Sequence, residues 1–440
     1  MRRISLAVAA GLVVAGPSAG AQQPAPAAQP APVDPRAVVA EARRVIAERY
    51  VLPERRPALD AVLAEGLSSG RYDVREPAAL AERINADLER VGRDRHLGIS
   101  YDPRRAAMMS AVRRTEAPDR SGYERQVRSR NHGVTELKVL PGNIRYLNYQ
   151  GFDWIGTESA AALETAMRFL SGGDAVIIDL RNNGGGSPDA VQYIISHFME
   201  ANRPLVTFHM NGEPTPNTLS SLAEVPAGRM LGKPLYVLIS GGTASAAEEF
   251  TGHVGGYRLG ELVGETTSGA GFRNELVPIE GGFMLSVSVG RAVLASTGRD
   301  WEAVGHSPTI RSDVGRALDV AQAHALRRLA ATAPEQDRAR FEGIAEALAA
   351  RAEPRPPALP LAAYAGSFGE RSVRLDQGRL YYQLGERPRR LLVPLGGNVF
   401  AFDDDPTIRL AFAANGTATT SLEIAPVGAP PQGRYERTGS

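Results

Sequence analysis

The chain has 440 residues, of which 43% are hydrophobic and 22% are charged, so it is long enough for two or three domains and at least one substantial core. This composition excludes a disordered or fibrous protein. The formal net charge of +1 gives no reason to expect a nucleic-acid partner or an anionic membrane partner. Because the chain has no cysteine, we expect neither a disulfide framework nor a membrane anchor on a lipid-modified cysteine.

The first residues have the features of a secretory signal peptide. Residues 1–21, MRRISLAVAAGLVVAGPSAGA, contain two arginines, an apolar run too short to span a bilayer, and a final A-x-A cleavage pattern. We expect cleavage after Ala21, a Pro- and Ala-rich linker over 22–33, and a mature protein that is periplasmic or secreted. A lone amphipathic anchor is the alternative interpretation of this stretch.

The segment after the linker predicts a helical domain over residues 34–100. Asp34 followed by Pro35 supplies an N-cap and a proline at the first helical position, and apolar residues then recur at helical spacing. His96 follows, between a helix end and a short strand expected at Leu97–Tyr101. A single histidine is more often a surface or core residue than a catalyst, so position alone gives His96 no role.

From about Val134, short apolar runs alternate with helices, which predicts an α/β core over residues 101–353 with two trailing helices. A buried strand expected at 174–180 is followed by Gly184, Gly185 and Gly186, and ligands bind at the carboxyl ends of such strands. The glycine run lacks the patterns of nucleotide-binding loops. We expect it either to let backbone N–H groups approach a substrate carbonyl or to form a plain tight turn.

The C-terminal part of the chain changes character. A proline-rich linker at 354–360 precedes short strand-like runs that are separated by turn residues. These runs predict a small antiparallel β domain over residues 361–440. Its charged residues form no catalytic pattern.

A strand-to-helix junction supplies the candidate nucleophile. The stretch LYVLISGGTASAAEEF has an apolar run of strand length, a Gly-Gly break, and a helix expected to begin at about Ala246. A serine there, Ser245, would lie beside free backbone N–H groups and the positive end of a helix dipole, which favour a developing oxyanion. Taken alone, however, the stretch fits a helix N-cap at least as well.

Several motifs in order resemble those of one family. RDRHLGI, LPGNIRYL, DLRNNGGG, TASAAEEF, LVGETTSG and WEAVGHSP resemble motifs of the tail-specific (C-terminal processing) serine peptidase superfamily, over roughly residues 34–330. The chain looks most like the branch of the interphotoreceptor retinoid-binding protein, which is related to the tricorn protease core. The resemblance implies an α/β fold with an N-terminal helical bundle and a crotonase-like ββα peptidase core.

The resemblance also implies roles for individual residues. Ser245 matches the nucleophile, and Gly185 and the N–H of Ala246 match the oxyanion hole, for which Gly184 and Gly186 are alternative donors. The best-known members use a Ser/Lys dyad, but the lysine position of their G-E-x-x-x-G-K-G segment is Ala270 here. A serine nucleophile needs a base within hydrogen-bonding reach, so this chain must supply another one.

Members that resemble the tricorn core use Ser, His and Glu instead. Their histidine follows the helical region, where this chain has His96, and their glutamate follows the final core strand, where it has Glu302. In such a triad Ser245 attacks, His96 takes and returns the proton, and Glu302 orients the imidazole. His253 and His306 are alternative histidines near the same motifs.

These observations lead to an expected function. We expect an exported serine endopeptidase that cleaves peptides or unfolded protein segments through an acyl-enzyme. No metal or organic cofactor is expected, because the chain has no H-E-x-x-H motif and no Cys/His cluster. The alternatives are a catalytically inactive carrier of an apolar ligand and an esterase or amidase that acts on small acyl substrates.

Overall fold

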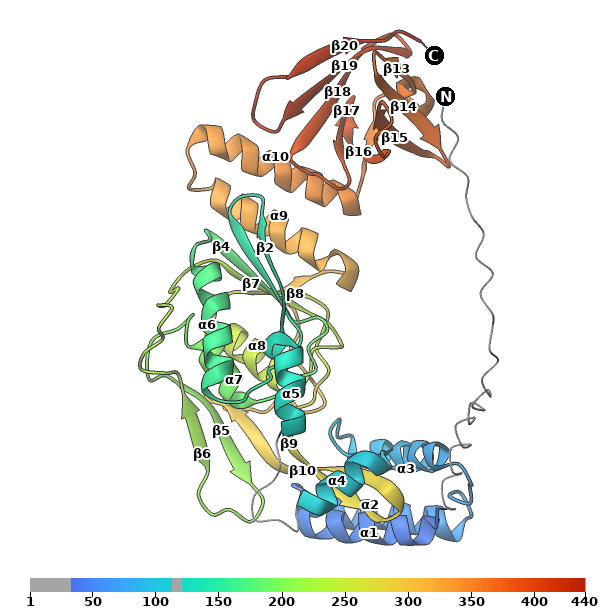
Figure 1. The fold of residues 1–440 in the computed structure, drawn as a ribbon, viewed down its shortest axis with the longest axis vertical. Helices are drawn as coiled ribbons and strands as arrows, with labels where there is room; N and C mark the ends of the chain where they lie inside the picture. Colours follow the sequence, from blue (N-terminus) through green and yellow to red (C-terminus); the bar gives the residue numbers. More distant parts are fainter. Residues whose placement is uncertain (1–32, 113–120, 440) are drawn as a thin grey trace, which may run out of the picture.

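A computed structural model describes residues 33–112 and 121–439 of the chain. The predicted signal peptide and all but the last residue of the predicted linker at 22–33 lie outside these residues. From one end of the molecule to the other, Figure 1 shows the N-terminal helices, an α/β core, two further helices and a C-terminal β-sheet domain. This arrangement confirms the expected fold class, with an N-terminal helical part, an α/β core and a small antiparallel β domain.

The N-terminal helices do not form a core of their own. Asp34 caps the first helix by accepting a hydrogen bond from the N–H of Arg36 at 2.9 Å, as its position before Pro35 predicted. The buried faces of three helices pack onto the end of a long hairpin, with Phe283 and Leu285 fully buried between them. The helices are α1 (Pro35–Arg49), α2 (Arg56–Ser68) and α3 (Pro77–Gly92), and the hairpin is β9 (Phe272–Ile279) and β10 (Phe283–Leu294).

The central sheet is mostly parallel and is covered on both faces. Its strand order is β11-β8-β7-β4-β3-β2, in which only the edge strand β2 runs antiparallel to its neighbour. Successive residues of β4 and β7 face opposite sides of the sheet. Val237 packs towards α6, α7 and α8, whereas Leu238 packs towards α9 and α10. Complete burial on both faces explains the uninterrupted apolar runs of these strands.

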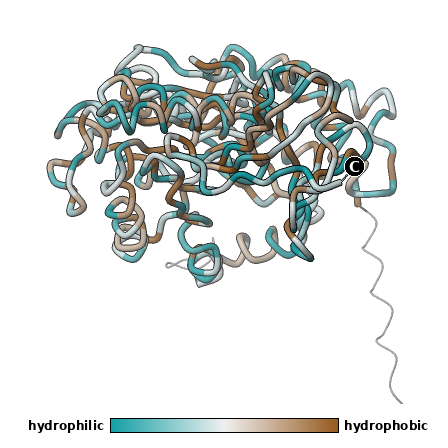
Figure 2. Tube along the Cα trace, turned by 90° about the horizontal axis from the view of Figure 1, so that it is seen from above, coloured by the Kyte–Doolittle hydropathy of each residue, from teal (hydrophilic) through white to brown (hydrophobic). Residues whose placement is uncertain are grey.

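The elements of this layer have the following bounds: β2 (Val134–Leu140), β3 (Ile144–Tyr149), β4 (Ala175–Asp179), β7 (Leu235–Ile239), β8 (Glu261–Gly264), β11 (Ile310–Arg311), α6 (Thr157–Ser171), α7 (Pro188–Ile195), α8 (Ala246–Gly256), α9 (Ala317–Ala330) and α10 (Glu335–Ala352). The helix expected at Ala246 begins at that residue. Figure 2 shows apolar segments running through the middle of the body, which is consistent with these shared cores.

A second sheet connects the helical part to the α/β core. Its order is β1-β10-β5-β6, with β9 on the other edge of β10, and its remaining strands are β1 (Gly98–Tyr101), β5 (Pro204–Met210) and β6 (Asn217–Ser220). One end of β10 pairs with β1, where Gly98 lies opposite Ser286, and the other end pairs with β5. This pairing fixes the turn that carries His96 relative to the core.

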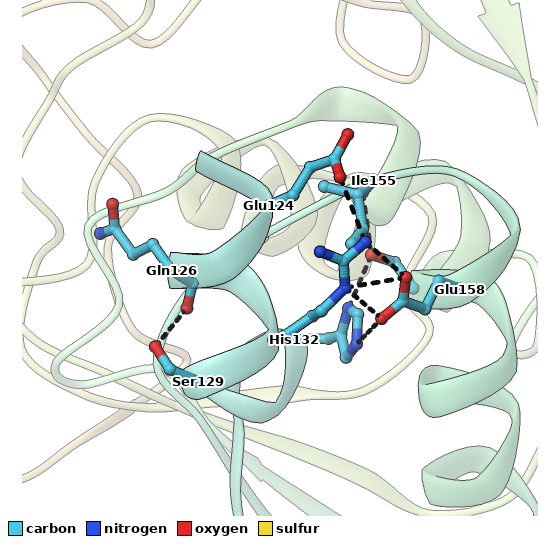
Figure 3. A network of polar contacts seen from close by, with 8 residues as sticks. Glu124, Gln126, Ser129, His132, Ile155 and Glu158 are labelled. Carbon is cyan, nitrogen blue, oxygen red and sulfur yellow. Dashed lines mark hydrogen bonds and ion pairs between the residues drawn. The ribbon is translucent and has the colours of Figure 1, made fainter. Parts of the chain in front are cut away.

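Two short helices, α4 (Pro103–Val112) and α5 (Ser121–Ser129), precede the central sheet. A polar network attaches α5 to the start of α6 (Figure 3). Arg128 donates to Glu158 from Nε at 2.8 Å and from Nη2 at 3.0 Å, and the His132 ring lies 2.8 Å from the hydroxyl of Ser159. The acidic Glu158 lies in the first turn of α6, where the helix dipole favours it.

The C-terminal domain is one antiparallel sheet with strands in sequence order from β13 to β20. The segment after α10 adds β12 (Arg355–Pro357), which pairs in parallel with β16. The bounds are β13 (Gly366–Phe368), β14 (Arg371–Asp376), β15 (Arg379–Leu384), β16 (Arg390–Gly397), β17 (Val399–Phe402), β18 (Ile408–Asn415), β19 (Ala418–Pro426) and β20 (Gly433–Glu436). Across the described ranges, no helix has the length and apolar character needed to cross a membrane.

A pair of leucine substitutions tests the central layer. Leu238 is fully buried in β7, so Leu238→Ala should lower the free energy of unfolding by about 2 to 5 kcal/mol. Leu231 is 47% exposed, so Leu231→Ala should change it by about 0.5 kcal/mol or less. Urea unfolding of both variants measures the difference, and equal effects would contradict the described packing of β7.

Candidate active site

Ser245 lies in a strained turn between β7 and α8. Its backbone angles are φ 55° and ψ −121°, whereas an ordinary N-cap residue is extended with a negative φ. Non-glycine residues in such sparsely populated regions cluster at functional sites. Ser245 and Ala246 line a cavity of about 220 Å³. The geometry therefore differs from that of a residue whose only role is to cap a helix.

The carboxylate of Glu248 holds this turn in place. Although fully buried, it accepts four hydrogen bonds, from the N–H of Ser245 at 3.0 Å, Gly269 at 2.7 Å and Ala270 at 2.8 Å, and from the hydroxyl of Thr267 at 2.6 Å. A buried carboxylate is stable only when it is paired or hydrogen-bonded in this way. Glu248 thus joins the backbone of the candidate nucleophile to the loop at 267–270, whose last residue, Ala270, also lines the cavity.

The glycine-rich loop after β4 lies against the same turn. A Cβ atom on Gly185, where φ is +103°, would lie 2.8 Å from the Cβ of Ser245 and 2.9 Å from the N of Ala246. Only glycine allows this close approach. The N–H of Gly185 donates to Oδ1 of the fully buried Asn183 at 2.9 Å. Within the described residues, no hydrogen bond engages the N–H of Gly186 or of Ala246, and both residues line the cavity.

His96 and Glu302 lie together, as the resemblance implied. Single ligand atoms of Asp94, His96 and Glu302 all lie within 4.8 Å of one another. Oε1 of Glu302 accepts from the N–H of Arg95 at 3.1 Å. Nδ1 of His96 and Oδ2 of Asp94 are buried, and neither atom has a hydrogen-bond partner among the residues that the structure describes. These three side chains could also offer ligand atoms to a metal ion, but the Glu302 carboxylate already has protein donors.

Two sets of hydrogen bonds connect His96 and Glu302 to residues of the cavity that Ser245 lines. Oε2 of Glu302 accepts from the N–H of Gly271 at 2.6 Å and of Phe272 at 2.9 Å, and both residues line the cavity. The carbonyl of His96 accepts from Ser286, whose hydroxyl accepts from Asn274, another lining residue. In the described part of the chain, no hydrogen bond joins Ser245 to His96.

Burial controls the protonation of the two candidate triad partners. It lowers the pKa of His96, against the opposing effect of Asp94, so the imidazole is neutral at neutral pH and able to accept a proton. Burial and the nearby charge of Asp94 raise the pKa of Glu302 to about 7, and the three backbone donors only partly offset this rise. A protonated His96 beside it would favour the ionised form of Glu302.

Neither lysine can replace the dyad lysine in this structure. Ala270 lines the cavity, so the expected lysine position is at the site but carries only a methyl group. Lys233 lies at the opposite end of β7 and donates to the carbonyls of Ser171 and Gly173. Lys138 pairs with Glu136 at 2.7 Å, on the antiparallel edge strand β2.

Sequence reasoning gave no role to several residues of this region. Glu248 follows Ser245 at the S-x-x-E spacing of a capping box, and that spacing could have indicated its bond to the Ser245 N–H. Asp94 stands two residues before His96, but no local pattern shows that it faces Glu302. The buried Glu249 also lines the cavity and likewise carries no local signal.

The raised pKa of Glu302 predicts a pH dependence of stability. Between pH 4.5, its ordinary value, and about pH 7, the folded protein keeps the Glu302 proton while the unfolded chain releases it. Wild type should therefore lose stability relative to Glu302→Gln as pH rises through this window, and the difference should level off above pH 7. Urea unfolding between pH 4 and 8.5 measures it.

Asp94→Asn supplies the control for this prediction. Because the charge of Asp94 helps to raise the pKa of Glu302, the pH window should move down when that charge is removed. A difference between wild type and Glu302→Gln that is constant over the whole pH range would show that Glu302 titrates at its ordinary value.

Comparisons with known proteins identify the family to which this chain is similar. Residues 143–312 match the model of peptidase family S41, and residues 34–129 match the model of the N-terminal domain of this peptidase in eukaryotic IRBP. A carboxyl-terminal-processing protease of Synechocystis is 32% identical over 120 residues, which are 27% of this chain and 27% of that protein. The chloroplastic C-terminal processing peptidase of Tetradesmus obliquus is 27% identical over 188 residues, which cover 41% of this chain and 38% of that protein. The matches thus span less than half of each of these relatives.

Among solved structures, the photosystem II D1 C-terminal processing protease aligns with a TM-score of 0.40 and 18% identity, over 64% of this chain and 94% of that one. A lipoprotein from Streptococcus agalactiae aligns with a TM-score of 0.46 and 14% identity, over 68% of this chain and 98% of that one. The two family models together cover the helical part and the α/β core, and they confirm the resemblance seen in the motifs. The chain therefore belongs to peptidase family S41.

Proposed function

We propose that the protein is a serine peptidase that cleaves peptides or unfolded protein segments through an acyl-enzyme on Ser245. The observation that carries this proposal is the position of Ser245, in a strained turn at the start of α8 and on a cavity whose lining residues Gly271 and Phe272 bind Glu302. Membership of a peptidase family supports the same reaction. The printed names of the two relatives refer to carboxyl-terminal processing, which makes a protein substrate the natural class.

In this mechanism His96 is the general base. Its neutral imidazole takes the proton of the Ser245 hydroxyl as Oγ attacks the scissile carbonyl, and it returns that proton to the leaving amine. Water then attacks the acyl-enzyme with the same help from His96. Glu302 orients the ring and stabilises the imidazolium. Because no hydrogen bond joins the two residues in the described part of the chain, His96 has to move towards Ser245 when substrate binds, and catalytic hydrogen bonds often form only then.

The oxyanion of the tetrahedral intermediate would be stabilised by backbone N–H groups. Ala246 is the first residue of α8, so its N–H has no partner within the helix and lies at the positive end of the helix dipole. The N–H of Gly186 is the second donor we propose, because that of Gly185 is already bound to Asn183. Gly185 would then serve mainly to let the loop approach Ser245.

Substitution of the triad tests the proposal. Ser245→Ala and His96→Ala should each lower kcat for a peptide substrate by about a thousandfold or more, because the members of a triad act as one unit. Lys233→Ala should leave kcat unchanged, since Lys233 binds carbonyls at the other end of β7. Peptide hydrolysis by Ser245→Ala at the wild-type rate would refute the proposal.

Covalent labelling separates the peptidase from its rivals. A serine-directed phosphonate should modify Ser245 in wild type and leave Ser245→Ala unmodified. An unlabelled Ser245 together with clear binding of an apolar ligand would instead support a carrier. Rapid turnover of small esters without any cleavage of peptides would support an esterase.

We also propose that the protein is exported, on the basis of residues 1–21. Expression of the full sequence in a Gram-negative host should yield a periplasmic protein whose first residue is Gln22, as measured by intact mass. Ala21→Arg should block this cleavage, because signal peptidase accepts only small residues there. Cytoplasmic protein that retains residues 1–21 would contradict the proposal.

A further inference from the structure

A buried acidic and histidine cluster lies behind the wall of the active-site cavity. Glu249 is on α8, four residues after Ser245, is only 4% exposed, and lines the same cavity. Its Oε1 accepts no hydrogen bond from the described residues and lies 3.5 Å from Nε2 of His253. His253 is fully buried, and within residues 33–112 and 121–439 neither of its ring nitrogens has a hydrogen-bond partner. The triad mechanism uses none of these atoms.

His306 completes the cluster on the side away from the cavity. It packs against α8 so closely that a Cβ atom on Gly252 would lie 2.9 Å from its Nε2, which also has no hydrogen-bond partner. Burial, with a smaller contribution from His253, lowers the pKa of His306 to about 4, so the His306 ring is neutral at neutral pH. The charge of Glu249 is therefore not neutralised from this side.

The surroundings of Glu249 are incomplete for a buried carboxyl group. Burial raises its pKa, while His253 and, more weakly, Arg273 lower it, and Asp189 raises it. Buried carboxylates normally accept several hydrogen bonds, as the neighbouring Glu248 does. Oε1 lies against His253, and among the described residues no side chain or backbone N–H lining the cavity donates a hydrogen bond to the Glu249 carboxyl group. A carboxyl group in a cavity wall without such donors costs free energy unless a ligand supplies one.

The rest of the cavity suits a side chain with an apolar stem and a polar end. Phe208 from β5 and Ala292 from β10 form apolar parts of the wall, and the exposed Arg273 stacks over the Phe208 ring at 5.6 Å. A volume of about 220 Å³ is below that of typical small-molecule pockets and fits a single amino-acid side chain. Lysine and arginine combine an apolar stem with a charged donor.

We propose that Glu249 is a specificity residue, and that it binds the basic side chain of the substrate residue whose carbonyl Ser245 attacks, the P1 residue. Residues four apart on a helix lie on one face, with Cβ atoms about 5 to 6 Å apart, which places Glu249 one turn beyond the attacking hydroxyl. The bound lysine or arginine would donate to the carboxylate in a charge-assisted hydrogen bond. This inference rests on the proposed peptidase function.

Peptides that differ only at P1 test the proposal. Lysine and arginine should give higher kcat/KM than norleucine, which has the lysine stem without the ammonium group, and than glutamine or glutamate. Glu249→Gln should lower kcat/KM for the lysine peptide by about 10- to 100-fold and change that for the norleucine peptide little. Glu136→Gln, at an exposed ion pair on β2, is the matched control and should keep the wild-type profile.

A binding measurement separates failure of this inference from failure of the proposed function. Fluorescence anisotropy on Ser245→Ala should give tighter binding of the lysine peptide than of the norleucine peptide, and Glu249→Gln in the same background should abolish the difference. Phosphonate labelling of Ser245 in Glu249→Gln checks that the variant is folded.

Two results would overturn the assignment of Glu249. The first is equal binding and equal cleavage of the lysine and norleucine peptides. The second is a basic preference at a position other than P1. If wild type cleaves no peptide and the phosphonate does not label it, the proposed function fails, while the binding comparison still decides whether Glu249 recognises a basic side chain.

Discussion

The buried carboxylate of Glu248 is the interaction on which the site depends. Ser245 adopts backbone angles that cost on the order of 1 to 3 kcal/mol, and such a conformation persists only when its surroundings over-determine it. Glu248 accepts the Ser245 N–H and three donors of the 267–270 loop, so one side chain fixes two walls of the cavity. The next two residues of that loop, Gly271 and Phe272, in turn bind Glu302. Removing the carboxylate would leave these donors unsatisfied in a dry interior, which is far more costly than losing one surface contact.

Acid and base strengths in the site follow from the same burial. Four carboxyl groups lie within the region, yet their environments differ. Glu248 is fully satisfied by donors, Glu302 is satisfied by three backbone N–H groups but faces Asp94, and Glu249 has an unpartnered oxygen. Different environments give neighbouring carboxyl groups different pKa values, so these groups are suited to different roles. Glu248 can thus hold the Ser245 turn, Glu302 can be the proposed partner of His96, and Glu249 can be the proposed contact for substrate, although all three lie close to one cavity.

Much of the fold could be predicted because its signals are local. The buried strand expected at 174–180 is β4 (Ala175–Asp179), and the helix expected at Ala246 begins there. The pairing of His96 with Glu302 came only from the family resemblance, because the two segments are about 200 residues apart and meet through tertiary contacts. The effect of Asp94 on the pKa of Glu302 also depends on a tertiary contact, so no local pattern in the sequence could predict it. The hydrogen bond from the Gly185 N–H to Asn183 depends on the conformation of the loop, and no residue pattern in the glycine run predicts it.

Strand β10 connects two hydrophobic cores of the molecule. Its first half belongs to the core shared with the N-terminal helices, and its last residues belong to the core that contains α8. His96 is anchored to the first half through Ser286, whereas Ser245 belongs to the second body. Strand β10 therefore links the part of the fold that holds the proposed base to the part that holds the proposed nucleophile, so the packing of the helical part affects the distance between them. Partial detachment of that part would separate the two proposed triad residues while leaving Ser245, Glu248 and the glycine loop in place.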